Sequence, residues 1–345
     1  MNQTKLISIC IPMYNGAKTL GATLVAMISQ IEKMTETDRE RFEIVLTDDG
    51  STDDTLQIAK EYSNKYRFVK LFINDKNLGM DGNFKQSAFN ATGEFVWYSG
   101  QDDIFLDGAL AKALQVIATN SNLGLIYFNF SQFDESRKKI VCDSVFHLQT
   151  VDPAKIDFSQ DLLFHNASEY FSFFTDGPSF LPAIVMRRSF WQTTNTDEFA
   201  GTYFIQYANI LLNLNNAKIV AVTQPFVRGL IPAAGWQKNG NKLFSIELGY
   251  LKAQAIVHQK RSDIFTKKMY LAKRSKYLRR FFYLCLAARW NGYKIDQKNI
   301  QDLRFIFGNK FIMKFYLLPL IYLAAIFPSV ILDKLVKCKD NILRR

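Results

Sequence analysis

The sequence predicts an α/β protein in which helices flank a mostly parallel sheet, followed by a basic helical C-terminal region. Short apolar runs alternate with segments of helical periodicity over residues 1–130, a pattern typical of parallel sheets with right-handed crossovers. Two aspartate pairs each follow one of these runs. The net charge is −7 over residues 1–225 and +18 over residues 226–345, so we expect two regions with different partners.

The alternating segments define the expected elements. Strands are expected where short apolar runs end at Pro, Gly or Asp: residues 6–12, 43–46, 69–73, 95–98, 125–130 and 218–222. Helices are expected where apolar residues recur every three or four positions: residues 18–32, 53–66, 82–91, 107–119 and 202–213. We therefore expect a catalytic-type domain over 1–225, a basic helical region over 226–310 and an apolar, basic tail over 311–345.

Cysteine and histidine contribute little to the predicted chemistry. The four cysteines are far apart and form no CxxC pattern, and the three histidines are scattered. This spacing excludes a zinc site or a disulfide framework and suits a reducing compartment. We also expect no signal peptide, because Met1 leads directly into a short strand.

The aspartate pairs lie at the ends of two predicted strands. Asp48-Asp49 follows residues 43–46, and Asp102-Asp103 follows residues 95–98. In an open parallel sheet, ligands bind outside the carboxyl ends of the strands. Mg²⁺ is typically held there by one or two carboxylates plus substrate phosphates. The sequence therefore predicts a metal–diphosphate site beside a second carboxylate cluster, although residues 48–54 could also be a turn that caps a helix.

Four motifs, in this order, make residues 1–130 resemble glycosyltransferase family 2, inverting enzymes with the GT-A (Rossmann-like) fold. They are ICIPMYN at 9–15, DDGSTDD at 48–54, NLGMDGN at 77–83, and ATGEFVW at 91–97 with QDD at 101–103. Their spacing is similar to that of the abequosyltransferase-like subgroup, which builds bacterial O-antigen and related surface polysaccharides. The resemblance weakens towards residue 225 and does not reach the C-terminal third.

The resemblance implies a donor site at the ends of the first strands. Pro12, Tyr14 and Asn15 would line the pocket for the nucleotide base. Asp49 would accept a hydrogen bond from the base, and Asp48 would support its loop. Asp81 is also expected on the donor side, although Asp81 and Asn83 could instead cap the helix at 82–91.

The resemblance also implies a divalent cation. Asp102 would contact the ribose or the waters of the metal, and Asp103 would bind Mn²⁺ or Mg²⁺ bridging the diphosphate. The family usually has Asp-x-Asp at this place, whereas this chain has Gln101 at the first position. Because Asp102 and Asp103 are present, we expect metal binding to persist.

An inverting transfer needs a general base for the acceptor hydroxyl. In the family this carboxylate starts a helix after Gly, but the matching segment 201–203 reads Gly-Thr-Tyr. Glu198, Asp197 and Asp176 are the candidates, and the base could also come from elsewhere. Trp236, in a polar loop bounded by glycines, could stack on a sugar on the acceptor side or belong to an ordinary surface loop.

The C-terminal region indicates contact with a membrane. Residues 315–332 carry no charge and have basic flanks, and this length is at the lower limit for a spanning helix. A spanning helix, an interfacial helix and a buried core or dimer helix all fit the pattern. The Lys/Arg-rich segment 267–280 could hold the protein on an anionic membrane surface. We expect the cytoplasmic face of the inner (plasma) membrane, with peripheral or tail-anchored attachment.

The leading interpretation is a glycosyltransferase that moves a sugar from a nucleotide-sugar donor to a lipid-linked oligosaccharide acceptor. A catalytically inactive glycosyltransferase-like subunit, which binds nucleotide sugar or acts as a scaffold, is the alternative, and Gln101 and the missing base favour it. Nucleic-acid binding by the basic segment is not expected, because the acidic N-terminal region and the apolar tail fit a membrane better.

Overall fold

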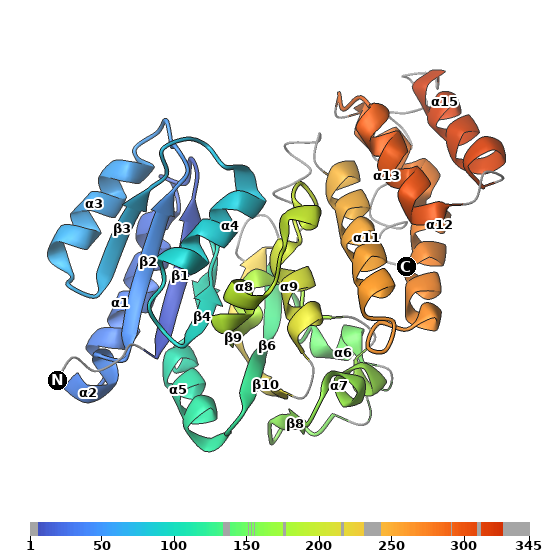
Figure 1. The fold of residues 1–345 in the computed structure, drawn as a ribbon. Helices are drawn as coiled ribbons and strands as arrows, with labels where there is room; N and C mark the ends of the chain where they lie inside the picture. The colour runs from blue at the N-terminus through green and yellow to red at the C-terminus, as the bar shows by residue number, and fades with distance from the viewer. Residues whose placement is uncertain are drawn as a thin grey trace. The chain divides into compact units, whose positions relative to one another are not determined.

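The computed structural model describes residues 6–326 apart from 134–138, 151, 153, 155, 175–176, 215–216, 231–242, 291 and 309–311. The chain forms two compact units, Met1–Leu230 and Ile231–Arg345 (Figure 1). The first unit ends later than the predicted boundary at 225 because β10 (Lys218–Leu230) continues through Pro225. The register shifts between Val222 and Val227, and such an irregularity accommodates a proline, which cannot donate to the sheet.

The first unit is built on one sheet with the strand order β3-β2-β1-β4-β9-β6-β10-β5. Its strands are β1 (Ile7–Met13), β2 (Phe42–Asp48), β3 (Val69–Ile73), β4 (Phe95–Tyr98), β5 (Ile104–Phe105), β6 (Leu123–Phe133), β9 (Ile184–Arg187) and β10, with β7 (Ile140–Cys142) and β8 (Leu162–Phe164) at its margins. The strands β3, β2, β1 and β4 are parallel neighbours. β9 is antiparallel to both β4 and β6, so β6 and β10 run in the direction of β1.

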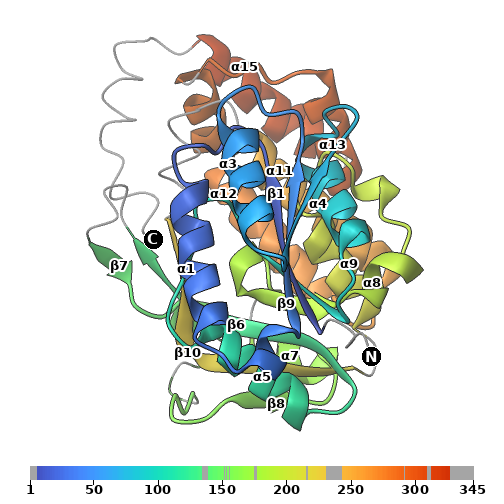
Figure 2. The ribbon, with the colours of Figure 1, turned by 90° about the vertical axis from the view of Figure 1, so that its left-hand side faces the viewer.

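Helices cover both faces of this sheet. α1 (Leu20–Glu32), α3 (Thr55–Lys65) and α5 (Ala109–Thr119) lie on one face, and α4 (Gly79–Asn90), α8 (Ser189–Thr193) and α9 (Ile205–Asn213) lie on the other (Figure 2). Every residue of β2 is buried, as expected for a strand covered on both sides. The predicted α/β fold class is confirmed.

The predicted elements are present, with shifted ends. α4 begins at Gly79 rather than 82, so the prediction that Asp81 and Asn83 cap this helix is wrong. α9 begins at Ile205 rather than 202, because Gly201 and Tyr203 have φ values of 78° and 66° and cannot continue a right-handed helix. The antiparallel strand β9 was not specified by the sequence pattern.

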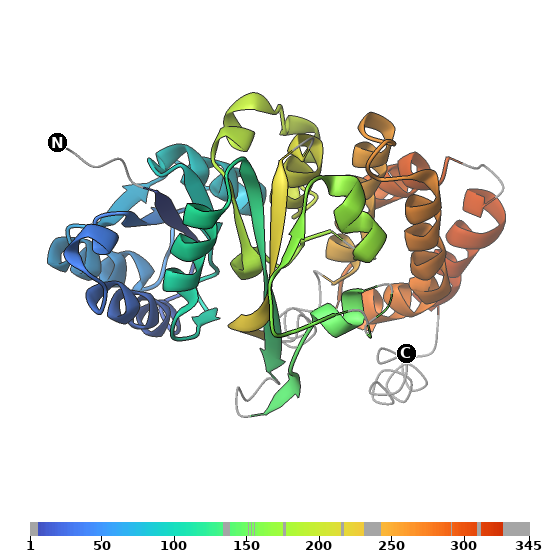
Figure 3. The same ribbon diagram turned by 90° about the horizontal axis from the view of Figure 1, so that it is seen from below.

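The second unit consists of helices in the part that the structure describes (Figure 3). They are α11 (Leu243–Lys260), α12 (Lys267–Trp290), α13 (Gln297–Phe307), the π-helical turn η4 (Met313–Leu317) and α15 (Leu318–Ile326). α11 packs against α12 and α13, and α15 packs against α12. The predicted helical C-terminal region is thus confirmed. Among residues 6–326 with the gaps given above, no helix has the length and apolar character needed to cross a bilayer.

Candidate active site

The two aspartate pairs lie at one edge of the sheet, where the parallel strands β1, β2 and β4 end. Met13, the last residue of β1, pairs with Asp48 of β2, and the backbone N–H of Asp49 donates to the carbonyl oxygen of Met13 at 3.0 Å. On the other side, the N–H of Ser99 donates to the carbonyl oxygen of Cys10 at 3.0 Å. The loops that carry the motifs therefore meet around the end of β1.

The first aspartate pair is satisfied by the protein itself. Asp48 Oδ2 accepts hydrogen bonds from the N–H groups of Gly50 and Ser51 at 3.2 and 3.1 Å, and Asp48 Oδ1 accepts one from Ser51 Oγ at 2.6 Å. Donors of the protein itself thus hold both carboxylate oxygens of Asp48. Donation from N–H and O–H groups stabilises a carboxylate in place of a counter-ion.

Asp49 anchors the loop that follows β3. Its side chain is almost fully buried, and Oδ1 accepts hydrogen bonds from Asn74 Nδ2 and the N–H of Leu78, both at 2.8 Å. Asn74 Nδ2 also lies 3.1 Å from Asn83 Oδ1, and Asn83 Nδ2 donates to the carbonyl oxygens at the ends of β1 and β2. Asn74 and Asn83 are thus site residues whose roles the sequence interpretation missed; Asn83 could have been recognised within the NLGMDGN motif.

A cavity of about 270 Å³ lies beside Asp49. Residues from the end of β3 and from α4 line it: Ile73, Asn74, Asp75, Lys76, Leu78 and Gln86. Asn74 belongs both to this lining and to the hydrogen-bonded group around Asp49. The cavity therefore borders the hydrogen-bonded group around Asp49, the residue for which the family resemblance implies a hydrogen bond with the nucleotide base.

The end of β1 presents Tyr14 and Asn15 at the surface. The Tyr14 side chain is 49% exposed, whereas Pro12 is half-buried in β1. Asn15 has a positive φ of 50°; its N–H donates to Ser51 Oγ at 3.0 Å and its Oδ1 accepts from the N–H of Thr52 at 2.8 Å. Asn15 thus ties this loop to the one after β2, while Tyr14 stays available to a ligand.

Gln101 connects the end of β4 to the end of β1. Its Nε2 donates to the carbonyl oxygen of Tyr14 at 3.0 Å, and its Oε1 accepts from the N–H of Tyr14 at 3.3 Å. A carboxylate could only accept, so an aspartate at this position could not form the pair. The departure from Asp-x-Asp therefore has a structural reason.

The second aspartate pair follows Gln101 directly. Asp102 is exposed, whereas Asp103 is 9% exposed and its Oδ2 accepts a hydrogen bond from the N–H of Gly100 at 2.7 Å. No group of three or more His, Cys, Asp or Glu side chains suited to a metal occurs in the described part of the chain. The carboxylates of Asp102 and Asp103 fit a hard divalent cation if diphosphate oxygens supply further ligands.

Asp81 lies against the segment in which a general base was expected. It is 6% exposed, and its Oδ2 accepts a hydrogen bond from the N–H of Tyr203 at 3.0 Å, while Oδ1 has no hydrogen-bond partner in the described part of the chain. Burial raises the pKa of Asp81, and the backbone N–H groups of residues 201–205 oppose this. Asp81 thus contacts the segment 201–203, in which the general base was expected. Its role in donor binding stays a prediction.

The three candidates for the general base differ in their surroundings. Asp197 forms an ion pair with Lys85 of α4, with Oδ1 2.8 Å from Nζ. Glu198, in the same 3₁₀ turn η3 (Asp197–Phe199), is exposed. Asp176 lies outside the described residues, as does Trp236.

Trp97, the last residue of the ATGEFVW motif, is a core residue. It is fully buried, and its Nε1 donates a hydrogen bond to the carbonyl oxygen of Pro182 at 2.7 Å.

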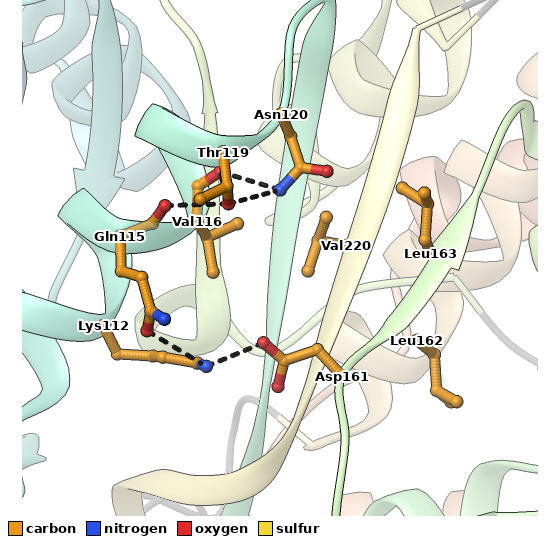
Figure 4. A pocket seen from close by; sticks show the side chains of 9 residues that line it. All are labelled: Lys112, Gln115, Val116, Thr119, Asn120, Asp161, Leu162, Leu163 and Val220. Carbon is orange, nitrogen blue, oxygen red and sulfur yellow. Dashed lines mark hydrogen bonds and ion pairs between the residues drawn. The ribbon is translucent and has the colours of Figure 1, made fainter.

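A second cavity, of about 190 Å³, lies away from the motifs (Figure 4). Its lining comes from α5, β8 and β10 and includes Lys112 and Asp161. These two side chains point toward each other and form an ion pair at 2.8 Å. No motif residue lines this cavity, so we assign it no part in the candidate site.

Comparison with known sequences finds a family for the N-terminal half of the chain. The model of the family described as Glycosyl transferase family 2 matches residues 8–176. The chain is 33% identical over 139 residues to the cholesterol galactosyltransferase of Borreliella burgdorferi, covering 39% of this chain and 36% of that protein. It is 31% identical over 145 residues to abequosyltransferase RfbV of Salmonella typhimurium, covering 41% and 38%. The chain thus spans well under half the length of these relatives.

A solved structure shows the same fold. A mannosyltransferase from Pyrobaculum calidifontis, in complex with GDP-Man and Mn²⁺, superposes with a TM-score of 0.50 at 13% identity, covering 97% of this chain and 87% of that chain. At this identity the likeness bears on the fold alone. The predicted GT-A fold is confirmed.

Proposed function

Residues 8–176 form a domain of glycosyltransferase family 2, and on that premise we propose that the chain transfers a glycosyl group from a nucleotide-sugar donor to an acceptor hydroxyl. The observation that carries the proposal is the meeting of the motif loops at one sheet edge. Gln101 joins the loop that carries Asp103 to Tyr14, and Asn15 joins Tyr14's loop to the one after Asp49. A donor bound there would lie beside the loops that carry the motifs.

The donor would lie with its base near Tyr14 and Asp49 and its diphosphate near the second aspartate pair. Asp102 and Asp103 would hold Mn²⁺ or Mg²⁺, which stabilises the charge developing on the departing nucleoside diphosphate. The Mn²⁺ bound to the Pyrobaculum mannosyltransferase supports this part of the proposal. Asp48 and Asp49 have a different task, because their oxygens already hold the surrounding loops.

The reaction would be a displacement at the anomeric carbon. The acceptor oxygen forms a bond to that carbon as the bond to the diphosphate oxygen breaks, and the leaving diphosphate keeps the electron pair. A carboxylate takes the proton of the acceptor hydroxyl. We propose Glu198 for this role, because it is exposed on η3, the turn that precedes residues 201–203, where the family resemblance implies the base.

We further propose a lipid-linked oligosaccharide acceptor and a part in bacterial surface polysaccharide synthesis, such as O-antigen or capsule, at the cytoplasmic face of the inner membrane. The name of the Borreliella relative, cholesterol galactosyltransferase, indicates a lipid acceptor. The similarity to the abequosyltransferase supports the polysaccharide role. The basic C-terminal region, with a net charge of +18 over residues 226–345, suits such a surface.

A catalytically inactive, nucleotide-sugar-binding or scaffold subunit remains the second candidate function. The replacement of the first Asp of Asp-x-Asp by Gln101 and the lack of an acid at residues 201–203 favour it. The two functions differ in turnover, since only the enzyme releases nucleoside diphosphate.

Release of nucleoside diphosphate from UDP-, GDP-, CDP- and dTDP-sugars tests the proposal. The assay is run with Mn²⁺, with a polyprenyl-diphosphate-linked saccharide or the matching free saccharide as acceptor. We expect release from one nucleotide class, stimulated by the lipid-linked acceptor. Binding of one donor without release would favour the inactive subunit, and equal use of the free saccharide would contradict the lipid-linked acceptor.

A further inference from the structure

The outer side of η4 and α15 is an apolar face in the second unit. Tyr316, Tyr322, Leu323 and Ile326 are 43%, 69%, 45% and 59% exposed. They recur at helical spacing and thus share one side. The other side is packed, since Ala324 is buried and its carbonyl oxygen accepts a hydrogen bond from Arg289 of α12 at 2.8 Å. Tyr316 lies at the rim of the exposed side, and its Oη donates to the carbonyl oxygen of Leu278 at 3.2 Å. We call the exposed side the α15 face.

α12, the helix that carries α15, has an exposed side rich in cations. Lys268, Lys276 and Arg279 are exposed on it, at positions that share one side of a helix. None of the three has an ion pair among the described residues. The acidic side chains in the described part of this unit have other partners: Glu247 pairs with Arg280, Asp263 with Arg261 and Asp302 with Lys252, and Asp296 caps α13. None of these four carboxylates neutralises the exposed cations of α12.

We infer that the α15 face docks on an anionic lipid bilayer, with the α12 cations held at the lipid headgroups. The combination of an apolar helix side with tyrosines and nearby Lys and Arg is typical of interfacial helices. α15 is fixed to α12 along its inner side, so its outer side is the one left for lipid. The inference rests on the proposed function, because a lipid-linked acceptor would be found at such a surface.

Charge separates the bilayer from other partners of the α15 face. Residues 231–345 carry a net charge of +17. A two-fold contact between copies presents the same patch on both sides, which would bring the α12 cations of two chains together. An anionic bilayer offers the opposite charge and an apolar interior at once. The bilayer is therefore the occupant that satisfies both features.

Sedimentation of the full chain with vesicles tests the inference. Phosphatidylcholine vesicles are compared with and without phosphatidylglycerol, at low and high salt, and no nucleotide sugar is present. We expect binding to the anionic vesicles that weakens with salt. Two triple variants, Tyr322→Ser/Leu323→Ser/Ile326→Ser and Lys268→Gln/Lys276→Gln/Arg279→Gln, should each lower the affinity about tenfold or more.

A matched control uses exposed positions in the first unit. Leu148, which is 71% exposed, is changed to Ser together with exposed Lys60 to Gln, and binding should stay at the wild-type level. Undiminished binding by both triple variants, or salt-independent binding to neutral vesicles, would overturn the inference. So would a serine variant that turns a dimer into a monomer, because the α15 face would then be a contact between copies. Since no donor is used, failure here leaves the proposed transferase reaction unaffected.

Discussion

The side-chain amide of Gln101 binds both backbone polar groups of Tyr14, donating to the carbonyl oxygen at 3.0 Å and accepting from the N–H at 3.3 Å. The two residues lie at the ends of β4 and β1, so the amide makes one rigid group of the loop that carries Tyr14 and the loop that carries Asp103. The residue that departs from the Asp-x-Asp pattern thus joins two of the loops that form the candidate site.

Replacing Gln101 by Glu should weaken donor binding. Glu keeps the length of the side chain but cannot donate to the carbonyl oxygen of Tyr14. It would instead place a carboxylate oxygen against that carbonyl oxygen, and both atoms are acceptors. A lost hydrogen bond of about 1 kcal/mol corresponds to roughly a fivefold rise in KM for the nucleotide sugar. Steady-state kinetics measure this, with exposed Gln192→Glu as the control. An unchanged KM would show that the Gln101–Tyr14 contact does not shape the donor site.

Asp103 should be required for metal-dependent turnover. Asp103→Asn keeps an oxygen for the N–H of Gly100 but removes the charge that attracts a cation, so we expect lost Mn²⁺ activation with an unchanged Tm. Asp103→Ala should lose the activation and also about 1–3 kcal/mol of stability, because the Gly100 N–H loses its acceptor. Rates over a Mn²⁺ titration, together with thermal unfolding, separate the two effects. Normal Mn²⁺ activation in Asp103→Asn would remove Asp103 from the metal site.

Asp81 should make the stability of the chain fall as pH rises. Burial raises the pKa of Asp81, so between roughly pH 4, the usual value for an aspartate, and the raised pKa the folded chain binds more protons than the unfolded chain. The stability that this group contributes is fully present below about pH 4 and is lost as pH rises through the raised pKa. Asp81→Asn keeps an acceptor for the N–H of Tyr203 and cannot ionise. The Tm of this variant should therefore rise relative to the Tm of the wild type as pH increases.

The Tm difference between Asp81→Asn and wild type, measured from pH 4 to 8, checks this prediction. Asp75→Asn, at an exposed position, provides the comparison and should show no such trend. A wild-type Tm that rose relative to Asp81→Asn at higher pH would contradict the burial of an unpaired carboxylate oxygen.

Glu198 should carry the proton transfer. Glu198→Gln is expected to lower kcat about 10²- to 10⁴-fold with little change in Tm, because the side chain is exposed. Asp197→Asn should have a smaller effect, since it loses an exposed ion pair with Lys85, and such pairs are worth about 0–1 kcal/mol. Transfer rates over a range of pH compare the two. A larger loss in Asp197→Asn would reverse the assignment.

Much of the first unit could be predicted from the sequence because short apolar runs alternate with segments of helical periodicity along it. β3 and β4 have the expected bounds, residues 69–73 and 95–98, and β1 and β2 differ by a residue or two. Continuous apolar runs between helical segments are a strong local signal. The position of both aspartate pairs at one sheet edge follows from the parallel order and could be predicted in the same way.

The contacts between distant segments could not be predicted. Asp81 and Tyr203 are far apart in the sequence, and only the packing of α4 beside α9 brings them together. Asn83 belongs to the NLGMDGN motif, but the sequence does not show that Asn74 and Asn83 together join Asp49 to the ends of β1 and β2. The antiparallel place of β9 between β4 and β6 could not be predicted, because it depends on long-range pairing rather than on a local pattern.

Thermal unfolding of wild type and Asp103→Asn with UDP-, GDP-, CDP- and dTDP-sugars, each with and without Mn²⁺, tests the proposed metal-assisted donor site directly. We predict that one nucleotide class raises the Tm of the wild type, that Mn²⁺ strengthens this rise, and that Asp103→Asn loses the part that depends on Mn²⁺. A wild type stabilised by none of the donors, or an Asp103→Asn variant stabilised as strongly by donor and Mn²⁺, would contradict a metal-assisted nucleotide-sugar site at this sheet edge.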